Sequence, residues 1–437
     1  MKVVIAPDKF KGSLAANAVV EAIAAGIRDV VGDRVRIVSL PVADGGEGTV
    51  EAAISAGYER RTTSVRGPLG STVDADWALR GGEAVIEMAA ASGLELVPSA
   101  VRDGLRASSY GTGELIRAAL DAGATTIVLG VGGSATTDGG AGMLEALGLK
   151  LLTPDGDAVE PGGAGLAGLA TVDAAGLDHR LAGARFVLAN DVDNPLCGPR
   201  GAAAIFGPQK GLGPDDIPVV DSNIGRWAKL LADALDFPAD GAEVPGAGAA
   251  GGVGFAALAA LRAVPRPGAE LVAELVGVPE SLEGATLAIT GEGSLDEQSL
   301  GGKAPMGVLA AARRAGVPAV MVCGRSLLSK EQWQEAGFTA LYSLSDRAGS
   351  AEESMREAAR LLREVGQDIA RSELAGTAGR TDSAGPDLLQ SRGTPGPECL
   401  ATTGGTTGEP ISRGIVGHVH ANRLEMQSAR ALSVDSR

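Results

Sequence analysis

The sequence predicts an α/β protein whose sheets are mainly parallel. Short runs rich in β-branched residues alternate with Ala- and Leu-rich segments of helical length as far as Ser372. Several runs, such as 125–130, are almost continuously apolar, which is typical of strands covered by helices on both faces. Alternation of this kind favours parallel strands joined by helices.

The individual elements follow from the period and length of the apolar runs. The clearest helix is 351–371, because apolar residues from Met355 to Ile369 recur on one face. We expect strands at 2–6, 35–39, 83–88, 125–130, 185–189, 285–290, 318–323 and 339–343. We expect the other helices at 14–29, 47–56, 112–122, 139–147, 215–235, 251–262 and 303–315.

The composition excludes several classes of partner and site. The chain has 437 residues, enough for two ordinary domains. Its formal net charge of -16 argues against nucleic acid and anionic membranes as partners. Any site for an anionic substrate must therefore gather local cations or backbone amides. Three scattered cysteines form neither a disulfide framework nor a zinc cluster.

The two ends of the chain differ in character. The apolar run in MKVVIAPDKF is too short for a signal peptide, and no stretch reaches the roughly 20 apolar residues of a membrane span. We therefore expect a cytoplasmic protein. Residues 373–437 are rich in Gly, Thr, Ser and Pro and lack a sustained period. We expect this tail to be disordered, because it cannot bury enough apolar surface to offset its conformational entropy.

Charged side chains directly follow the first predicted strand, in the segment APDKFKGSL. Ligands of open α/β sheets bind beyond the carboxyl ends of the strands. We interpret Lys9 and Lys11 as contacts for phosphate or carboxylate, and Asp8 as a metal ligand or proton acceptor. Ser13 is a candidate substrate contact. The alternative is a polar loop in which Ser13 caps the next helix.

The second strand leads into an acidic, glycine-rich loop, PVADGGEGT. Paired glycines allow the backbone to approach a ligand closely. Asp44 and Glu47 are candidates for a base, a Mg²⁺ ligand or an acceptor from a substrate hydroxyl. The alternative is a turn at a helix start, where acidic side chains favour the positive end of the helix dipole.

A Gly/Ser/Thr loop at 130–142, GVGGSATTDGGAG, follows a strand and precedes a helix. Backbone amides of such a loop can hold phosphate. As a dinucleotide fingerprint the loop is weak, because no second strand ending in an acidic residue follows at the expected distance. The alternative is a helix entry that needs glycine torsions. Our candidates for a phosphate-binding loop are Gly132, Gly133, Ser134 and Thr136.

Four oxygen-bearing side chains crowd residues 190–194, at the end of another strand. Such side chains suit Mg²⁺ or a polyhydroxylated ligand, and Asp191 and Asp193 are our metal candidates. Arg200 follows as an anion contact. The alternative is an Asx-rich turn ahead of Pro195.

The last candidate segment is TGEGSLDEQSLGGK at 290–303, which also follows a strand. Lys303, at a helix start, is a candidate nucleotide contact, and Asp296 a candidate substrate contact. The segment is not a Walker A motif, because Ala304 follows Lys303 and the upstream glycine spacing fails. A nucleotide site here would be of another design.

Together these motifs resemble the type-1 glycerate kinase family. The resemblance covers residues 1–372 and rests on the order of APDKFKGSL, PVADGGEGT, SSYGTGELI, GVGGSATTDGGAGML, ANDVDNPLCGPRGAAAIFGPQKG, GAGAAGGVGFA and TGEGSLDEQSLGGKAP. It implies transfer of the ATP γ-phosphoryl group to a hydroxyl of D-glycerate with Mg²⁺. We favour 2-phosphoglycerate over 3-phosphoglycerate as the product, although the sequence leaves this position open.

The resemblance also implies two α/β domains flanking a cleft, one flavodoxin-like and one similar to a restriction-endonuclease core. One domain would combine 1–68 with 285–372 and so hold both chain ends of the body, and the other would span 69–284. The oligomeric state stays open, a homodimer included.

The mechanistic hypothesis needs distant loops to meet, because phosphoryl transfer depends on positioning and charge neutralisation. Lys9, Lys11 and Lys303 would neutralise substrate charge, and Asp8 or Asp44 would orient or deprotonate the hydroxyl. A catalytic role for Asp191 would come through Mg²⁺. The rival hypotheses are a nucleotide-dependent oxidoreductase and a non-enzymatic hydroxy-acid sensor.

Overall fold

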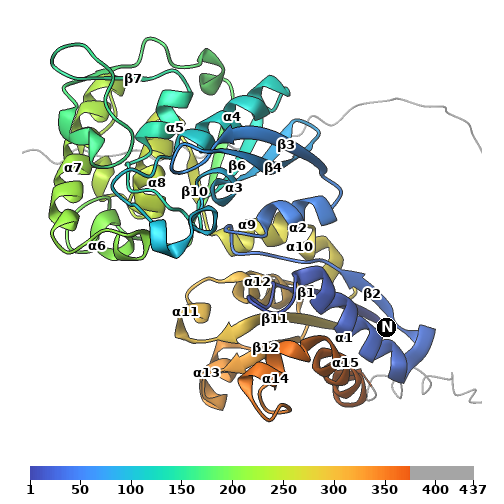
Figure 1. The fold of residues 1–437 in the computed structure, drawn as a ribbon. Coiled ribbons are helices and arrows are strands. Elements are labelled where there is room, and N and C mark those ends of the chain that lie inside the picture. The colour runs from blue at the N-terminus through green and yellow to red at the C-terminus, as the bar shows by residue number, and fades with distance from the viewer. Residues whose placement is uncertain (375–437) are drawn as a thin grey trace, which may run out of the picture. The chain divides into compact units, whose positions relative to one another are not determined.

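Two large β-sheets organise the protein (Figure 1). The structure is a computed structural model and describes residues 1–374. Every strand predicted from the apolar runs is present, and most strand pairs are parallel, so the predicted α/β class is confirmed. A small additional sheet pairs β7 (Lys150–Leu152) with β8 (Thr171–Asp173).

The first sheet brings together the two ends of the described chain. Its strand order is β13-β12-β11-β1-β2, and every pair in it is parallel. The carboxyl ends of all its strands therefore lie at one edge. The strands are β1 (Lys2–Pro7), β2 (Arg36–Ser39), β11 (Leu287–Leu295), β12 (Ala319–Ser326) and β13 (Ala340–Ser343).

Helices cover both faces of this sheet, which explains why its strands are continuously apolar. Val3 and Ile5 of β1 join one core cluster, and Val4 and Ala6 join the cluster on the opposite face. The first cluster includes α1 (Ala16–Val31) and α15 (Ala358–Ile369). The second includes α9 (Gly268–Leu275), α10 (Val278–Leu282) and α12 (Ala304–Ala315).

α1 and α15 pack closely because glycines face the partner helix. A Cβ at Gly26 would lie 1.9 Å from the carbonyl oxygen of Arg363, and one at Gly366 would lie 2.3 Å from that of Ile23. The single helix expected at 351–371 is broken, since α14 (Ala351–Arg356) ends before α15 begins. The prediction that Met355 shares the buried face was wrong, because it is 51% exposed.

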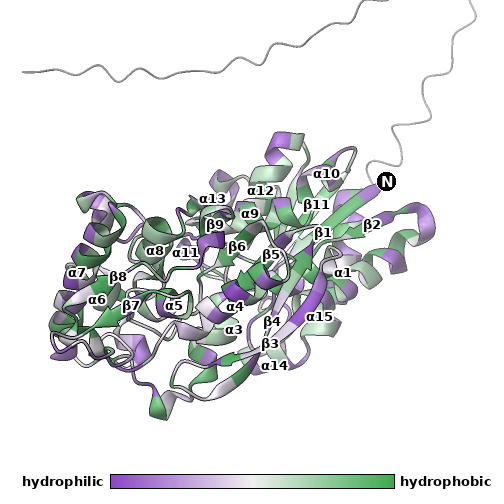
Figure 2. Cartoon of the chain, turned by 90° about the horizontal axis from the view of Figure 1, so that it is seen from above, coloured by the Kyte–Doolittle hydropathy of each residue, from purple (hydrophilic) through white to green (hydrophobic). Residues whose placement is uncertain are grey.

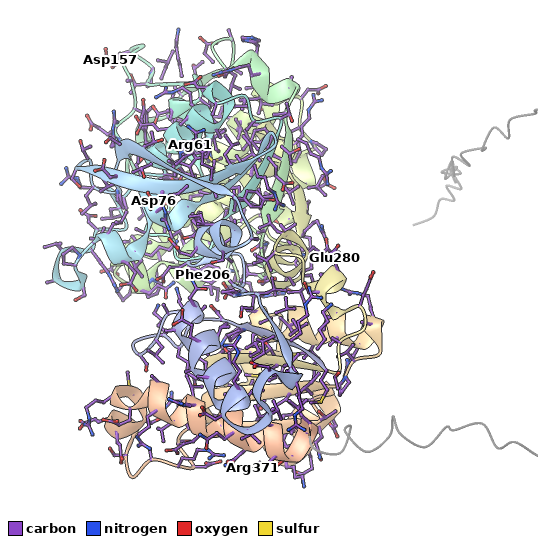
Figure 3. The ribbon with its side chains drawn as sticks, turned by 90° about the vertical axis from the view of Figure 1, so that its right-hand side faces the viewer. Arg61, Asp76, Asp157, Phe206, Glu280 and Arg371 are labelled. Atoms are coloured by element: carbon purple, nitrogen blue, oxygen red, sulfur yellow. The ribbon has the colours of Figure 1, made fainter. Side chains whose placement is uncertain are left out.

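The second sheet has the order β10-β9-β6-β5-β4-β3. Its first four strands are parallel, and β4 and β3 extend it as an antiparallel hairpin. Sequence analysis missed this hairpin because its strands alternate polar and apolar residues. Figure 3 shows Arg61 and Asp76 on it. The strands are β3 (Glu59–Arg66), β4 (Thr72–Arg80), β5 (Glu83–Glu87), β6 (Thr126–Gly130), β9 (Arg185–Ala189) and β10 (Val264–Arg266).

The helices around the second sheet bury the largest core cluster, which includes Phe186, Trp227 and Phe255. Figure 2 shows the strands as mostly hydrophobic, with the hydrophilic colour strongest on the outer helices. The helices are α2 (Thr49–Ser55), α3 (Met88–Ser92), α4 (Tyr110–Asp121), α5 (Ala141–Ala146), α6 (Ala202–Phe206), α7 (Asp216–Leu235) and α8 (Ala249–Ala260). Two further helices, α11 (Glu297–Leu300) and α13 (Lys330–Ala336), follow β11 and β12.

Three predictions concern the organisation of the chain as a whole. Residues 370–374 form a π-helical turn with Leu374 buried, and the rest of the predicted tail lies outside the described residues. The predicted boundaries after 68 and 284 stay a prediction, and residues 1–374 fall within one compact unit. Across those residues, no helix combines the length and apolarity needed to cross a membrane.

Candidate active site

Two adjoining cavities lie at the carboxyl ends of the strands. The larger has a volume of about 850 Å³ and the smaller about 520 Å³. Both are lined by Lys11, Asp44, Gly46, Glu47, Gly132 and Gly133, so they form one continuous cleft. The five predicted loops, 8–13, 44–49, 132–138, 191–193 and 292–303, each contribute lining residues to it.

The loop after β1 places a carboxyl and an ammonium group in the larger cavity. Oδ1 of Asp8 accepts a hydrogen bond of 2.6 Å from the backbone N–H of Lys9. Burial, with a further contribution from Asp44, raises the pKa of Asp8 to about 7. Nζ of Lys9 forms an ion pair of 2.7 Å with Glu47. Ser13 lines the same cavity and donates to the carbonyl of Met355.

The loop after β2 touches the glycine loop after β6 through backbone atoms. A Cβ at Gly132 would lie 2.7 Å from Cα of Gly46, and one at Gly130 would lie 2.3 Å from the carbonyl oxygen of Gly45. Oδ1 of Asp44 accepts from the N–H of Gly46 at 3.0 Å. These glycines therefore allow the loop after β2 of the first sheet to meet the end of β6 of the second sheet, at the wall that the two cavities share.

A buried lysine supports the glycine loop from behind. Nζ of Lys210 donates to Oγ of Ser134 at 2.8 Å and to the carbonyl of Thr136 at 2.7 Å. Gly133 and Ser134 line the cleft, whereas Thr136 is fully buried and lies outside both cavity walls. Burial lowers the pKa of Lys210 to about 7. Lys210 is thus a structural anchor of the loop and also part of the wall of the smaller cavity.

The glycine loop does not have the structural context of a dinucleotide fingerprint. α5 begins at Ala141, several residues beyond the cavity-lining Gly132 and Gly133. A pyrophosphate on such a fingerprint would sit at the helix N-terminus that directly follows the glycines. The loop therefore supports binding of an anion through its own amides rather than through that motif.

The structure separates the two predicted metal ligands. Asp191 lines the smaller cavity, and its Oδ1 accepts from the N–H of Gly268 at 2.7 Å, at the start of α9. Burial, together with the charge of Asp44, raises the pKa of Asp191 to about 7. Asp193 is exposed and forms an ion pair of 3.3 Å with Arg200. Asp193 and Arg200 both lie outside the two cavity walls. Within residues 1–374, no three acidic, His or Cys side chains are arranged to hold a metal ion.

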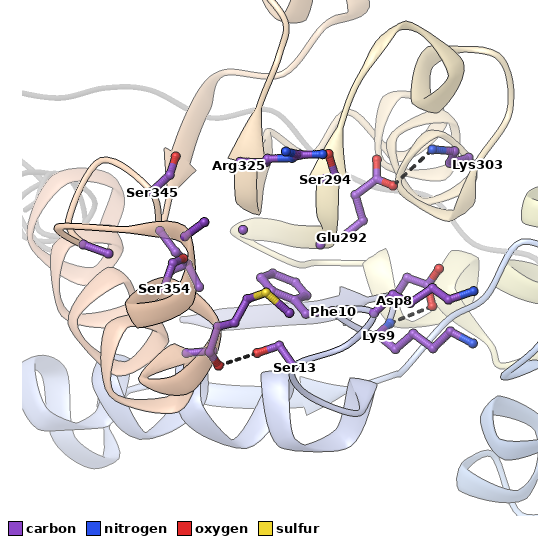
Figure 4. A pocket seen from close by; sticks show the side chains of 18 of the residues that line it. Asp8, Lys9, Phe10, Ser13, Glu292, Ser294, Lys303, Arg325, Ser345 and Ser354 are labelled. Carbon is purple, nitrogen blue, oxygen red and sulfur yellow. Dashed lines mark hydrogen bonds and ion pairs between the residues drawn. The ribbon is translucent and has the colours of Figure 1, made fainter.

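The strand β11 supplies a second buried carboxyl to the larger cavity (Figure 4). Burial raises the pKa of Glu292 to about 7, and its Oε1 has no hydrogen-bond partner among the described residues. Nζ of Lys303 lies 3.8 Å from Glu292 and 3.3 Å from Asp296. Asp296 caps α11 through the N–H of Ser299 and lies outside both cavity walls.

Sequence reasoning missed several charged residues of the cleft, among them Arg325 and Glu87. Arg325, near the end of β12, lines the larger cavity, and its only polar contact within the described chain is with Oγ of Ser294. Glu87, at the end of β5, accepts from the N–H groups of Gly48 and Val50 and lines the smaller cavity. Arg325 follows the strand predicted at 318–323, and Glu87 lies near the end of the strand predicted at 83–88, so the strand-end rule alone could have indicated both.

A mixed α/β fold with cations, carboxyls and a glycine loop around one cleft is the arrangement expected of an enzyme that transfers phosphoryl groups to small molecules. Comparison with known proteins gives the same class. The model of the glycerate kinase family matches residues 3–373. The chain belongs to the glycerate kinase family.

Individual relatives agree with this assignment. The chain is 47% identical to the Glycerate 2-kinase of Escherichia coli K12 over 362 residues, which cover 82% of this chain and 94% of that protein. It is 45% identical to the Glycerate kinase of Bacillus subtilis 168, covering 85% and 97%. A crystal structure from Salmonella typhimurium LT2, described as a candidate glycerate kinase 2, superposes with a TM-score of 0.76 at 43% identity. That match covers 86% of this chain and 99% of the other.

Proposed function

We propose that the chain transfers the γ-phosphoryl group of ATP to D-glycerate with Mg²⁺ and that 2-phosphoglycerate is the product. The Escherichia coli relative is named Glycerate 2-kinase, which supports transfer to the 2-hydroxyl. The observation that carries the proposal is the cleft itself, in which loops from both sheets bring cations and buried carboxyls together. Such a cleft can position two anionic substrates and exclude water from the reaction.

Asp8 is the general base in this proposal. A base works best when its pKa lies near the working pH, and burial raises the pKa of Asp8 to about 7. Asp8 would accept the proton of the attacking hydroxyl while Asp44 orients the same hydroxyl. Lys9, Lys11 and Lys303 would neutralise substrate oxygens, which is the main demand of phosphoryl transfer.

The carboxyls fit a divalent cation. Burial, with a smaller contribution from the charge of Asp44, raises the pKa of both Asp191 and Glu292, and Oε1 of Glu292 is buried without a partner in the described chain. A cation between such groups relieves their repulsion, and oxygen ligands are those Mg²⁺ prefers. Asp44 and Asp191 would hold it together with phosphate oxygens of the nucleotide, because no three such side chains within residues 1–374 are already arranged as a metal site. Asp193 would have to leave Arg200 to join them. The cation would neutralise charge on the transferring phosphoryl group.

The remaining predicted contacts keep their roles as part of the proposal. Gly132, Gly133 and Ser134 would bind phosphate oxygens, with Thr136 shaping the loop from behind. Ser13 and Glu47 would contact substrate from the cavity wall. Arg200 and Asp296 would act on substrate only after a rearrangement, since both lie outside the cavity walls. A cytoplasmic location and a homodimer stay predictions.

A coupled assay with ATP, Mg²⁺ and D-glycerate tests the function, with the product analysed by phosphorus NMR. We expect turnover that requires all three components and a phosphate on the 2-hydroxyl. Binding of glycerate without turnover would instead support the sensor hypothesis. A signal at the 3-hydroxyl would overturn the proposed position but not the activity.

A further inference from the structure

We infer that the cleft has two subsites: the larger cavity takes the nucleoside of the nucleotide, and the smaller cavity takes the hydroxy acid. The phosphoryl group would then pass across the wall that the cavities share. This division rests on the proposed function and adds a place for each substrate.

The side of the larger cavity that is lined by residues 344–358 has the chemistry of a nucleoside site. Every lining residue between Leu344 and Ala358 is uncharged, with serines among alanines, one glycine, Leu344 and Met355. Phe10, which is almost fully buried, adds an aromatic ring to the same cavity. Uncharged apolar surface with a few hydroxyl groups suits a planar base and a ribose. It offers no cation to a carboxylate.

The opposite side of the same cavity has the positive charges that a triphosphate needs. Figure 4 shows Ser345 and Ser354 on one side and the ammonium groups of Lys9 and Lys303 on the other, where the carboxyl of Asp8 also lies. Arg325 also lines this cavity and has no ion pair with a carboxylate within residues 1–374. A guanidinium with free donors is well suited to phosphate oxygens. The cavity is therefore uncharged at one end and ionic at the other, like a nucleotide.

The smaller cavity matches a compact acid better. Its cationic lining residues are Lys11, which is shared, and Lys210, whose ammonium group is buried and hydrogen-bonded. The remaining wall combines apolar residues such as Ala90, Leu94 and Leu96 with the carboxyls of Asp44, Glu47, Glu87, Glu95 and Asp191. With Lys210 about half protonated at pH 7, these two groups can pair with one carboxylate but leave a triphosphate poorly neutralised. Asp44, which lines both cavities, would face the acceptor hydroxyl at the wall that they share.

Bulky substitutions in each cavity test the division. Ala351 lines the larger cavity and is exposed, so tryptophan can be introduced there without disturbing the core. We expect Ala351→Trp to weaken ATP binding about tenfold or more, measured by titration calorimetry, while inorganic tripolyphosphate binds within about twofold of wild type. Glu352→Trp, on the same helix but outside the cavity walls, is the matched control and should bind both ligands normally.

Val192→Trp supplies the reciprocal measurement, because Val192 lines only the smaller of the two cavities. We expect it to raise the KM for D-glycerate about tenfold and to leave the Kd for ATP within about twofold. Unchanged ATP binding in Ala351→Trp, or equal loss of ATP and tripolyphosphate binding, would overturn the division. The calorimetry needs no turnover, so an enzyme that fails to phosphorylate D-glycerate would refute the proposed function while the nucleoside subsite is still decided.

Discussion

Replacing Lys210 by methionine should change how the stability of the protein depends on pH. Burial lowers the pKa of this lysine from 10.5 to about 7. Above pH 7 the folded protein therefore binds fewer protons than the unfolded chain, and the free energy of unfolding rises with pH until the unfolded lysine also deprotonates. Between pH 7 and 9 the folded lysine passes from about half protonated to neutral. At about 1.4 kcal/mol per pH unit per proton, the gain is about 2 kcal/mol.

Urea denaturation at pH 7 and pH 9 measures this gain. Lys210→Met keeps the length of the side chain but removes the titrating group, so its free energy of unfolding should rise by about 2 kcal/mol less than that of wild type. Other titrating groups contribute equally to both proteins and cancel in the difference. Lys229→Met, at an exposed position of α7, is the control and should follow wild type. The reasoning fails if Lys210→Met and wild type respond to pH alike.

Three further predictions concern catalysis and packing. Asp8→Asn should lower kcat about 100-fold or more, and wild-type activity should rise as pH increases through about 7 while Asp8 loses its proton; near-normal turnover in the variant would exclude Asp8 as the base. Arg325→Met should raise the KM for ATP about 10- to 100-fold, with partial recovery in Arg325→Lys, because it removes charge-assisted hydrogen bonds to phosphate; an unchanged KM would remove Arg325 from the site. Gly26→Ala should destabilise the protein by about 1–3 kcal/mol in urea denaturation, because its Cβ would overlap α15. Gly183→Ala is the control, since its Cβ would lie 3.7 Å from the nearest atom, and equal stability of the two variants would contradict the packing argument.

The sequence by itself determined the class of fold and the positions of most strands. Runs such as 127–130 and 186–189 are apolar throughout, and burial on both faces follows from that local property. The sequence did not predict the hairpin of β3 and β4, because its residues alternate between polar and apolar. This pattern is a weaker signal, which indicates a strand clearly only when the partner strand is known. The break between α14 and α15 also escaped, because Met355 continues the apolar spacing although its side chain faces the cavity.

The strand-end rule also indicated, from sequence alone, which loops line the cleft. It placed Asp8, Asp44 and Gly132 near a ligand because parallel strands end at one edge. It could not separate Asp191, which lines a cavity, from Asp193, which pairs with Arg200 at the surface, because adjacent residues in a loop point in different directions.

Only the tertiary structure decided how these groups act on one another. The pKa of Asp8 is raised by burial and by the charge of Asp44. The pKa of Lys210 is lowered by burial, and the charge of Asp138 opposes this effect. The contact between Arg325 and Ser294 exists only because β12 lies beside β11. Burial and charge interactions are set by neighbours distant in the chain, whereas strand and helix patterns are set by neighbours close in sequence.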